Sequence, residues 1–262
     1  MQKYMNLFLN SALAVAYKSN TQIARVLTES WVAQNGYCPN CASSSITQHR
    51  NNAPVRDFFC PYCAEQFELK SKNGHKIGAK VNDGAYETMM QRIQADDSPN
   101  FLFLSYRKAD YAVQQLVLVP RHFINPDMIV RRKPLPVTAK RAGWVGCVMN
   151  MAMLPTSGKI LLIDKAQAIP PQQVRQQWQQ TLFLRHQKAT RKGWLLAIMR
   201  CVERLPEQFT LAQIYQFETQ LQLQFPDNKH IKDKIRQQLQ VLRDQQVIEF
   251  VGRGQYRKIE IV

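Results

Sequence analysis

The chain has 262 residues, enough for one large domain or two of ordinary size, and the 45% that are hydrophobic exclude a disordered chain. Its 35 Lys and Arg residues against 19 Asp and Glu residues give a net charge of +16, which favours a polyanionic partner such as nucleic acid. No apolar run approaches the roughly 18 residues of a membrane-spanning helix, and the N-terminus lacks the residue order of a signal peptide, so we expect a protein of the cytoplasm.

The first two thirds of the chain alternate between helical and strand patterns. Residues 5–34 are apolar at helical spacing and predict one or two helices, whereas residues 35–72 favour short strands and turns. A helix is expected over Asn82–Gln94, introduced by Asp83-Gly84, and a linking helix over residues 172–180. Three short apolar runs between turn residues predict strands: Phe101–Tyr106, Leu116–Val119 and Lys159–Ile163. This order predicts a mixed α/β core.

The pattern changes near residue 185, where we place a boundary between a domain of residues 1–184 and a domain of residues 185–262. The second segment begins with an apolar helical pattern from Trp194 to Leu205. Thr210 and Gln213 then fit a capping box, which predicts the start of a second helix. A third helix is expected from about Asn228 to Arg243. Two strand-like runs around Gly252-Arg253-Gly254 predict a final hairpin.

Three helices followed by a hairpin is the element order of an α+β winged-helix domain, a DNA-binding fold. The segment has 14 basic and 8 acidic residues, and its basic side chains concentrate on the third helix and at the hairpin tip. We therefore expect contacts with DNA from Lys232, Lys234, Arg236 and Arg253. The alternative is a solvated helix face and turn.

Four of the six cysteines form two Cys-x-x-Cys pairs, Cys38 with Cys41 and Cys60 with Cys63, separated by 18 residues. Two such turns can close a tetrahedron of thiolates around Zn²⁺, and the spacing is that of a four-cysteine zinc site. A redox role is the rival interpretation, but a redox centre uses one pair at a helix N-terminus. Because cysteine fills all four positions, we expect a structural metal ion. Cys147 and Cys201 are interpreted as buried small hydrophobic residues.

Two acidic residues and a lysine flank the second cysteine pair. Asp57 follows Pro54-Val-Arg and precedes Glu68-Leu69-Lys70 by eleven residues, and both segments resemble strands. Strand alternation places Glu68 and Lys70 on one face and Leu69 on the other. Asp57, Glu68 and the carbonyl of Leu69 would be oxygen ligands for Mg²⁺, and Lys70 would orient or deprotonate an attacking water. The set fits phosphodiester hydrolysis.

That motif is weak by itself, because Asp followed by Glu-x-Lys arises by chance in many chains. The alternative is a purely structural role, as a solvated strand face with a salt bridge. Two features favour the catalytic interpretation: the motif straddles the second cysteine pair, and it lies in a strongly basic chain with a predicted DNA-binding domain.

The motif resembles that of PD-(D/E)XK nucleases, and the chain as a whole resembles the DpnI restriction endonuclease family. The resemblance covers nearly the whole chain through these motifs: Tyr17-Lys18-Ser19-Asn20, the two cysteine pairs, Phe67-Glu68-Leu69-Lys70-Ser71-Lys72, Asn82-Asp83-Gly84-Ala85-Tyr86, Arg141-Ala142-Gly143-Trp144, His230-Ile231-Lys232 and Gly252-Arg253-Gly254.

The resemblance implies a PD-(D/E)XK core with a zinc-binding insertion, followed by the winged helix. It further implies a type II endonuclease that cuts double-stranded DNA at GATC when the adenine is methylated at N6. Asp57, Glu68 and Lys70 would then be catalytic, the four cysteines would bind Zn²⁺, and Trp144 would line the pocket for the adenine methyl groups. The alternative for Trp144 is an ordinary core tryptophan.

Two other functions remain open from the sequence. One is a zinc-ribbon and winged-helix protein that reads methylated DNA without cutting it. The other is a nuclease of the same fold with a shifted sequence or methyl preference. No membrane and no obligatory protein partner are inferred in any of these cases.

Overall fold

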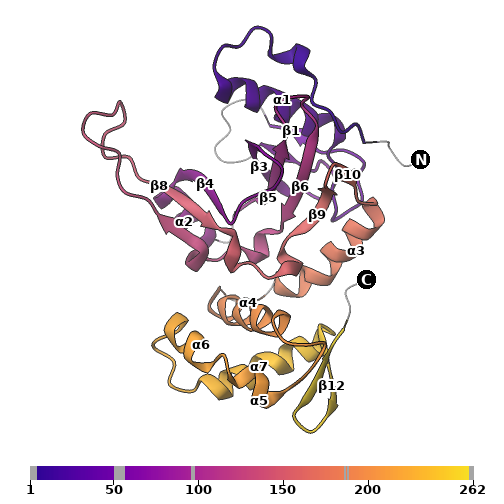
Figure 1. Ribbon diagram of the computed structural model, residues 1–262, viewed down its shortest axis with the longest axis vertical. Coiled ribbons are helices and arrows are strands. Elements are labelled where there is room, and N and C mark those ends of the chain that lie inside the picture. The colour runs from indigo at the N-terminus through magenta and orange to yellow at the C-terminus, as the bar shows by residue number, and fades with distance from the viewer. Residues whose placement is uncertain (1–4, 50–56, 96–97, 186, 188, 260–262) are drawn as a thin grey trace.

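The computed structural model describes residues 5–49, 57–95, 98–185, 187 and 189–259. Its centre is a seven-stranded sheet with the strand order β1-β2-β3-β5-β6-β9-β10 (Figure 1). The strands of this sheet are β1 Thr47–Gln48, β2 Phe58–Phe59, β3 Gln66–Asn73, β5 Asn100–Tyr106, β6 Val113–Val119, β9 Ile160–Asp164 and β10 Gln167–Ala168. The strands predicted at 101–106, 116–119 and 159–163 are confirmed as β5, β6 and β9.

Apolar residues cover both faces of this sheet. Helices α1 (Asn20–Asn35) and α3 (Pro171–Thr181) lie on one face, where Leu27 and Trp178 pack with Leu102 and Leu104. The alternating residues Phe101 and Phe103 of β5 point to the other face, where they belong to the same core as Met89 and Ile93 of α2 (Tyr86–Gln94). Both faces are therefore buried, which explains why β5 is apolar throughout rather than alternating with polar residues.

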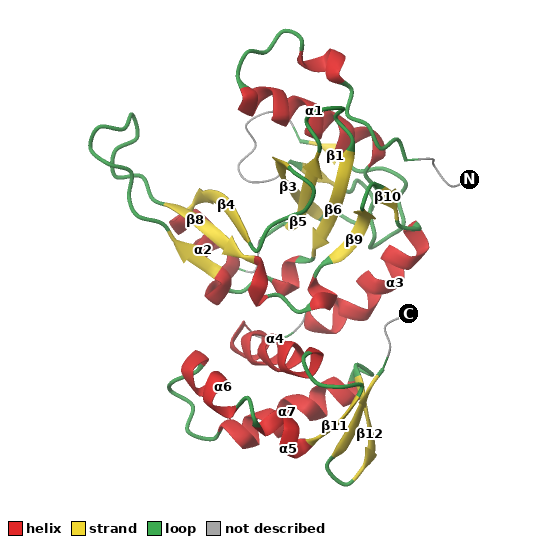
Figure 2. Ribbon diagram, in the orientation of Figure 1, coloured by secondary structure: helices red, strands yellow, loops and turns green. Residues whose placement is uncertain are grey.

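A second, three-stranded sheet has the order β4-β8-β7 and lies beside the first (Figure 2). Its strands are β4 Lys80–Ala85, β8 Gly146–Asn150 and β7 Ile129–Arg131. The sequence did not predict β7 or β8. It also predicted a helix over Asn82–Gln94, whereas α2 spans Tyr86–Gln94. The first four residues of that range instead pair with β8, so long-range strand pairing prevails over the local turn signal of Asp83-Gly84.

The C-terminal segment has the predicted three-helix and hairpin order, with one helix divided. Its elements are α4 Ala189–Glu203, β11 Gln208–Thr210, α5 Leu211–Tyr215, α6 Glu218–Gln224, α7 Ile231–Asp244, β12 Ile248–Gly252 and β13 Gln255–Lys258. The capping box of Thr210 and Gln213 is present. Strand β11, which was not predicted, completes a small sheet of order β11-β13-β12. This is the winged-helix architecture expected from the sequence.

The described segments also contain six short 3-10 helices: η1 Ser11–Ala14, η2 Arg121–Phe123, η3 Pro126–Met128, η4 Met151–Met153, η5 Thr156–Gly158 and η6 Leu182–Leu184. None of the helices in these segments is long and apolar enough to cross a membrane.

His122 is a buried histidine of η2 that lies against Thr181 and Trp178 of α3, and its burial predicts that the fold is sensitive to acid. Its Nε2 lies 2.8 Å from the Thr181 hydroxyl, and its Nδ1 is buried without a partner among the described residues. Burial, helped by the positive charges of Arg185, Lys192 and Arg121, lowers the pKa of His122 to about 3.

An unfolded histidine titrates near 6.5, so the unfolded chain takes up the proton first as the pH falls, and the stabilisation present above that value is lost between 6.5 and 3. We expect the free energy of unfolding to fall by about 2 kcal/mol more between pH 7 and pH 5 in the wild type than in His122→Gln. Urea unfolding at both pH values measures this difference, with the exposed His75→Gln as control. Equal losses in the wild type and His122→Gln would contradict it.

Candidate active site and metal cluster

Strand β3 positions Glu68 and Lys70 on the same face, as strand alternation predicted. Phe67 and Leu69 alternate with them along the strand and point to the other face. Phe67 is buried in the core, and Leu69 packs against the same core. β3 runs parallel to β5 with Glu68 opposite Phe101 and Lys70 opposite Phe103. The polar pair therefore stands on a rigid, central strand whose other face is anchored in the core.

Asp57 lies in a bend immediately before β2, not within a strand as the sequence pattern indicated. Its backbone N–H donates to the carbonyl of Phe67 at 3.0 Å, and its side-chain Oδ2 accepts the N–H of Leu69 at 2.7 Å. The preceding Pro54-Val-Arg segment lies outside the described residues. These two bonds hold the Asp57 carboxylate at the edge of β3 beside Glu68.

The backbone of Leu69 faces the same edge. In a strand, the N–H and C=O of one residue point to the same side, and the N–H of Leu69 points at Asp57. Its carbonyl is therefore directed to the edge where Asp57 lies, next to Glu68 on the same strand.

Lys70 contacts two carboxylates, one expected and one not. Its Nζ forms ion pairs with Oε1 of Glu68 and with Oδ1 of Asp83, which belongs to β4 of the second sheet. Asp83 was not predicted as a site residue, because Asp83-Gly84 was interpreted as a helix start. No local pattern identified it, because residues 82–85 form a strand only through their pairing with β8.

Burial is the main cause of the pKa shifts of the two carboxylates, and it opposes the shift of Lys70. It raises the pKa of Glu68 to about 7, with Asp83 and Asp57 adding to the increase and Lys70 opposing it. Burial also raises the pKa of Asp57, against the hydrogen bond from Leu69 and the charge of Lys70. For Lys70, burial alone would lower the pKa, but Glu68 and Asp83 outweigh it and the net shift is upward. Lys70 is thus held as an ammonium ion among carboxylates.

The donor set fits a divalent cation. Oε2 of Glu68 and Oδ2 of Asp83 are buried without a hydrogen-bond partner among the described residues, an arrangement that costs free energy unless a cation or water meets them. Mg²⁺ takes oxygen ligands and usually keeps several waters, and the half-buried Asp57 carboxylate leaves room for both.

The four cysteines predicted to bind zinc form one cluster. Their sulfur atoms all lie within 4.8 Å of one another, and each is a free thiol. The two turns match in detail: Ala42 and Ala64, each directly after the second cysteine of its pair, both have a positive φ, of 62° and 60°. The cluster can hold a metal ion.

Cys147 and Cys201 are buried away from this cluster, as predicted.

The cysteine cluster is joined directly to the carboxylates. Cys60 and Cys63 lie in the turn between β2 and β3, and the N–H of Cys60 donates to the carbonyl of Glu65 at 2.8 Å. Phe58 of β2 pairs with Phe67 of β3, so one end of this hairpin carries the cysteines and the other carries Asp57 and Glu68.

Trp144 lies at the base of a long loop, residues 132–145, between β7 and β8, which extends away from the body of the protein at the left of Figure 1. The loop is mostly exposed, and the N–H of Leu135 donates to the carbonyl of Trp144 at 2.9 Å. The Arg141 guanidinium lies 4.5 Å from the centroid of the indole ring. Trp144 is half-buried and outside the main core, which argues against an ordinary core tryptophan.

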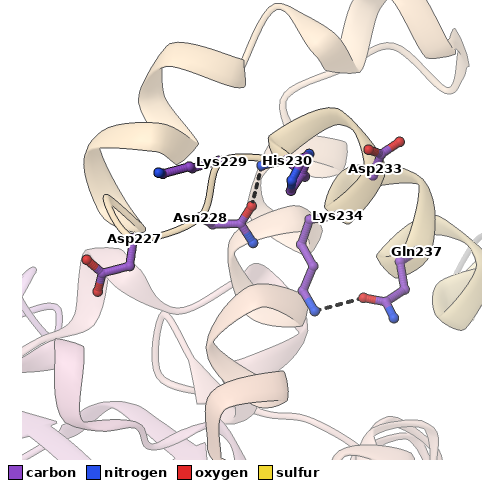
Figure 3. A pocket seen from close by; sticks show the side chains of 7 residues that line it. All are labelled: Asp227, Asn228, Lys229, His230, Asp233, Lys234 and Gln237. Carbon is purple, nitrogen blue, oxygen red and sulfur yellow. Dashed lines mark hydrogen bonds between the residues drawn. The ribbon is translucent and has the colours of Figure 1, made fainter.

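The predicted DNA contacts of the third helix lie along α7, but they do not all face the same way. Lys232 pairs with Glu218, and Arg236 pairs with Asp233. Lys234 donates to the side chain of Gln237 at 2.7 Å across a cavity of about 560 Å³ at the start of α7 (Figure 3).

The loop before α7 adds further polar groups to that cavity, none of which was predicted as a DNA contact: Asp227, Asn228, Lys229 and His230 (Figure 3). Asn228 Oδ1 accepts the N–H of His230 at 2.8 Å, which fixes the entry to the helix. Arg253 lies exposed at the tip of the β12–β13 hairpin, next to Gly254, whose φ of 67° closes the turn.

Two family models match the chain. The model of the Dam-replacing family, DpnI, matches residues 5–187, and that of the Dam-replacing HTH domain, DpnI_C, matches residues 190–258. The chain belongs to the DpnI family. The resemblance found in the sequence is thereby confirmed over nearly its whole length, and membership of the family supports a nuclease that binds DNA.

Proposed function

We propose that this DpnI family member is a type II restriction endonuclease that cleaves double-stranded DNA at GATC sites containing N6-methyladenine, by Mg²⁺-dependent phosphodiester hydrolysis. The observation that carries the proposal is the convergence of Asp57, Glu68 and the Leu69 backbone at one edge of β3, with the Lys70 ammonium beside them. In this proposal residues 1–184 form the nuclease domain and residues 185–262 the DNA-binding domain.

Each residue of the site has a defined task. Asp57, Glu68 and the carbonyl of Leu69 would hold Mg²⁺, which supplies an activated water and neutralises charge on the phosphate. Lys70 orients the attacking water and stabilises the negative charge that develops on the phosphoryl oxygens. Asp57 is fixed by the Leu69 N–H and Glu68 by its strand, so little reorganisation is needed when the phosphodiester arrives.

The cysteine cluster has a structural role in the proposal. Four thiolates fill the coordination shell of Zn²⁺, so no position is left for substrate. The ion would instead hold the turn between β2 and β3 closed, and with it the spacing of Asp57 and Glu68.

Recognition of the methyl groups requires several small contributions. Burial of one methyl group contributes only about 0.8 kcal/mol, roughly fourfold in affinity. Methyl groups on both strands, an apolar pocket that stays empty or wet without them, and two domains that read the site can together supply the discrimination. Trp144 suits the pocket because an indole ring offers apolar surface without an acceptor for water.

Replacing Trp144 by alanine tests that part of the proposal. We expect the preference for methylated over unmethylated duplexes to fall about tenfold, because the apolar wall of the pocket is lost. Competition binding in Ca²⁺ measures the ratio of the two dissociation constants. Leu223→Ala, which removes an exposed apolar side chain of α6, serves as control. An unchanged ratio in Trp144→Ala would remove Trp144 from methyl recognition.

In the winged helix, Lys232, Lys234, Arg236 and Arg253 would contact phosphates or bases. Lysine and arginine bind phosphate through charge, and the arginines are the better guanine readers because their planar fork matches the O6 and N7 acceptors. The ion pairs of Lys232 and Arg236 are exposed, so exchanging their acidic partners for DNA phosphates costs little.

The decisive experiment incubates the purified protein and Mg²⁺ with plasmid from an adenine-methylating host and with the same plasmid from a non-methylating host. Discrete fragments from the methylated plasmid alone are expected, with ends that map within GATC. Specific binding without cleavage, even after addition of Mn²⁺, would replace the proposal by a non-catalytic reader of methylated DNA. Ends at other sequences would indicate a nuclease with a shifted preference.

A further inference from the structure

Asp83 reaches the candidate active site from a different sheet than the other residues. It lies on β4, opposite Cys147 of β8, whereas Glu68 and Lys70 lie on β3 of the seven-stranded sheet. Its side chain is only 2% exposed, yet it forms an ion pair with the Lys70 ammonium. A buried carboxylate is expensive to maintain, so its placement here requires a specific partner.

The local backbone aims this carboxylate at Lys70. The pairing of β4 with β8 shifts register between Asp83 and Ala85, a bulge that redirects the side chain. Oδ1 of Asp83 also accepts the N–H of Gly84 at 2.6 Å, which fixes the orientation of the carboxylate. The other oxygen, Oδ2, is buried without a donor in the described part of the chain. The ammonium of Lys70 is therefore its main source of compensating charge.

Lys70 has a second partner in Glu68, but of the two carboxylates only Glu68 is also a proposed metal ligand. Glu68 is a proposed ligand of the divalent cation, and a cation there would attract the Glu68 carboxylate and repel the ammonium beside it. Asp83 is held by β4 and by its own backbone contact, so it can keep the ammonium in place under that repulsion. The bulge and the buried charge of Asp83 both help to hold the Lys70 ammonium in place.

We propose that Asp83 is a positioning residue, which holds the Lys70 ammonium at the reaction centre while Glu68 binds the divalent cation. The proposal rests on the proposed function for its consequence in catalysis, and on the contact between Asp83 and Lys70 for its physical basis.

Asp83→Asn isolates the charge, because its amide oxygen can still accept the N–H of Gly84. We expect the single-turnover rate of cleavage of a methylated duplex in Mg²⁺ to fall at least a hundredfold. The dissociation constant for that duplex in Ca²⁺ should stay within twofold of the wild type. Asp110→Asn removes a carboxylate from an exposed ion pair with Arg107 and should match the wild type in both measurements.

A second measurement does not depend on cleavage. In a double-mutant cycle of Asp83→Asn and Lys70→Met, followed by urea unfolding, we expect the two substitutions to be non-additive by at least tenfold in the unfolding equilibrium constant. If the wild type does not cleave methylated DNA, the proposed function fails, but this cycle still tests the contact.

Three results would overturn the positioning role. Additivity in the cycle would mean that Asp83 and Lys70 do not interact. Wild-type cleavage by Asp83→Asn would make the carboxylate dispensable. A loss of cleavage matched by an equal loss of DNA binding would make it purely structural.

Discussion

Substitution of Lys70 by alanine should reduce the cleavage rate of methylated DNA about a thousandfold while leaving specific binding within a few fold of the wild type. The expected loss is that of a charged group which stabilises developing negative charge in a site shielded from water. Lys70 has this position because the buried carboxylates of Glu68 and Asp83 both pair with its half-buried side chain. Single-turnover cleavage in Mg²⁺ and duplex binding in Ca²⁺ measure the two quantities separately.

The alanine variant needs a control for folding, because it leaves Glu68 and Asp83 buried without their shared cation. Lys70→Met keeps most of the apolar volume and should be equally inactive. Lys108→Ala, in the exposed turn after β5, should cleave at the wild-type rate. Full activity of Lys70→Ala would remove Lys70 from the mechanism and favour the salt-bridge interpretation of the motif.

Loss of the metal from the cysteine cluster should disable cleavage without any change to a catalytic residue. Structural zinc contributes about 10–16 kcal/mol of binding free energy to small domains, which here would stabilise the turn that joins Asp57 to Glu68. We expect Cys60→Ser to lose bound zinc and at least a hundredfold in cleavage rate at saturating Mg²⁺.

The measurement combines the zinc content per chain with single-turnover cleavage. Using a variant instead of a chelator leaves the catalytic metal ion in place, so the two metal requirements stay separate. Cys201→Ala, at a buried thiol outside the cluster, should keep both zinc and activity. A zinc-free Cys60→Ser protein that cleaves normally would show that the carboxylates keep their spacing without the cluster.

Both predictions concern a site in which the sequence and the tertiary structure contributed different parts. The two Cys-x-x-Cys pairs, the alternation of Glu68 and Lys70 on one strand face and the capping box at Thr210 could all be predicted. Each of these features is defined by neighbours within a few residues or by a repeated spacing, so its geometry follows from local backbone periods and ligand chemistry.

The residues whose placement could not be predicted are those with partners distant in the sequence, or those whose local sequence pattern conflicts with long-range pairing. Asp57 was predicted in a strand, but it is placed by a side-chain bond to Leu69 from a bend outside β2. Strands β7 and β8 were missed because they are only 3 and 5 residues long, too short to show a clear alternation, and it is the order β4-β8-β7 that makes them a sheet.

The sequence by itself determined the cysteine cluster, the shared face of Glu68 and Lys70 on β3 and the order of the elements in the C-terminal segment. Only the tertiary structure decided that Asp83 belongs to the same site as Lys70. The physical reason is that a strand pattern specifies which side chains share a face, whereas the contact between two sheets depends on β4–β8 pairing and on a bulge that no local pattern specifies.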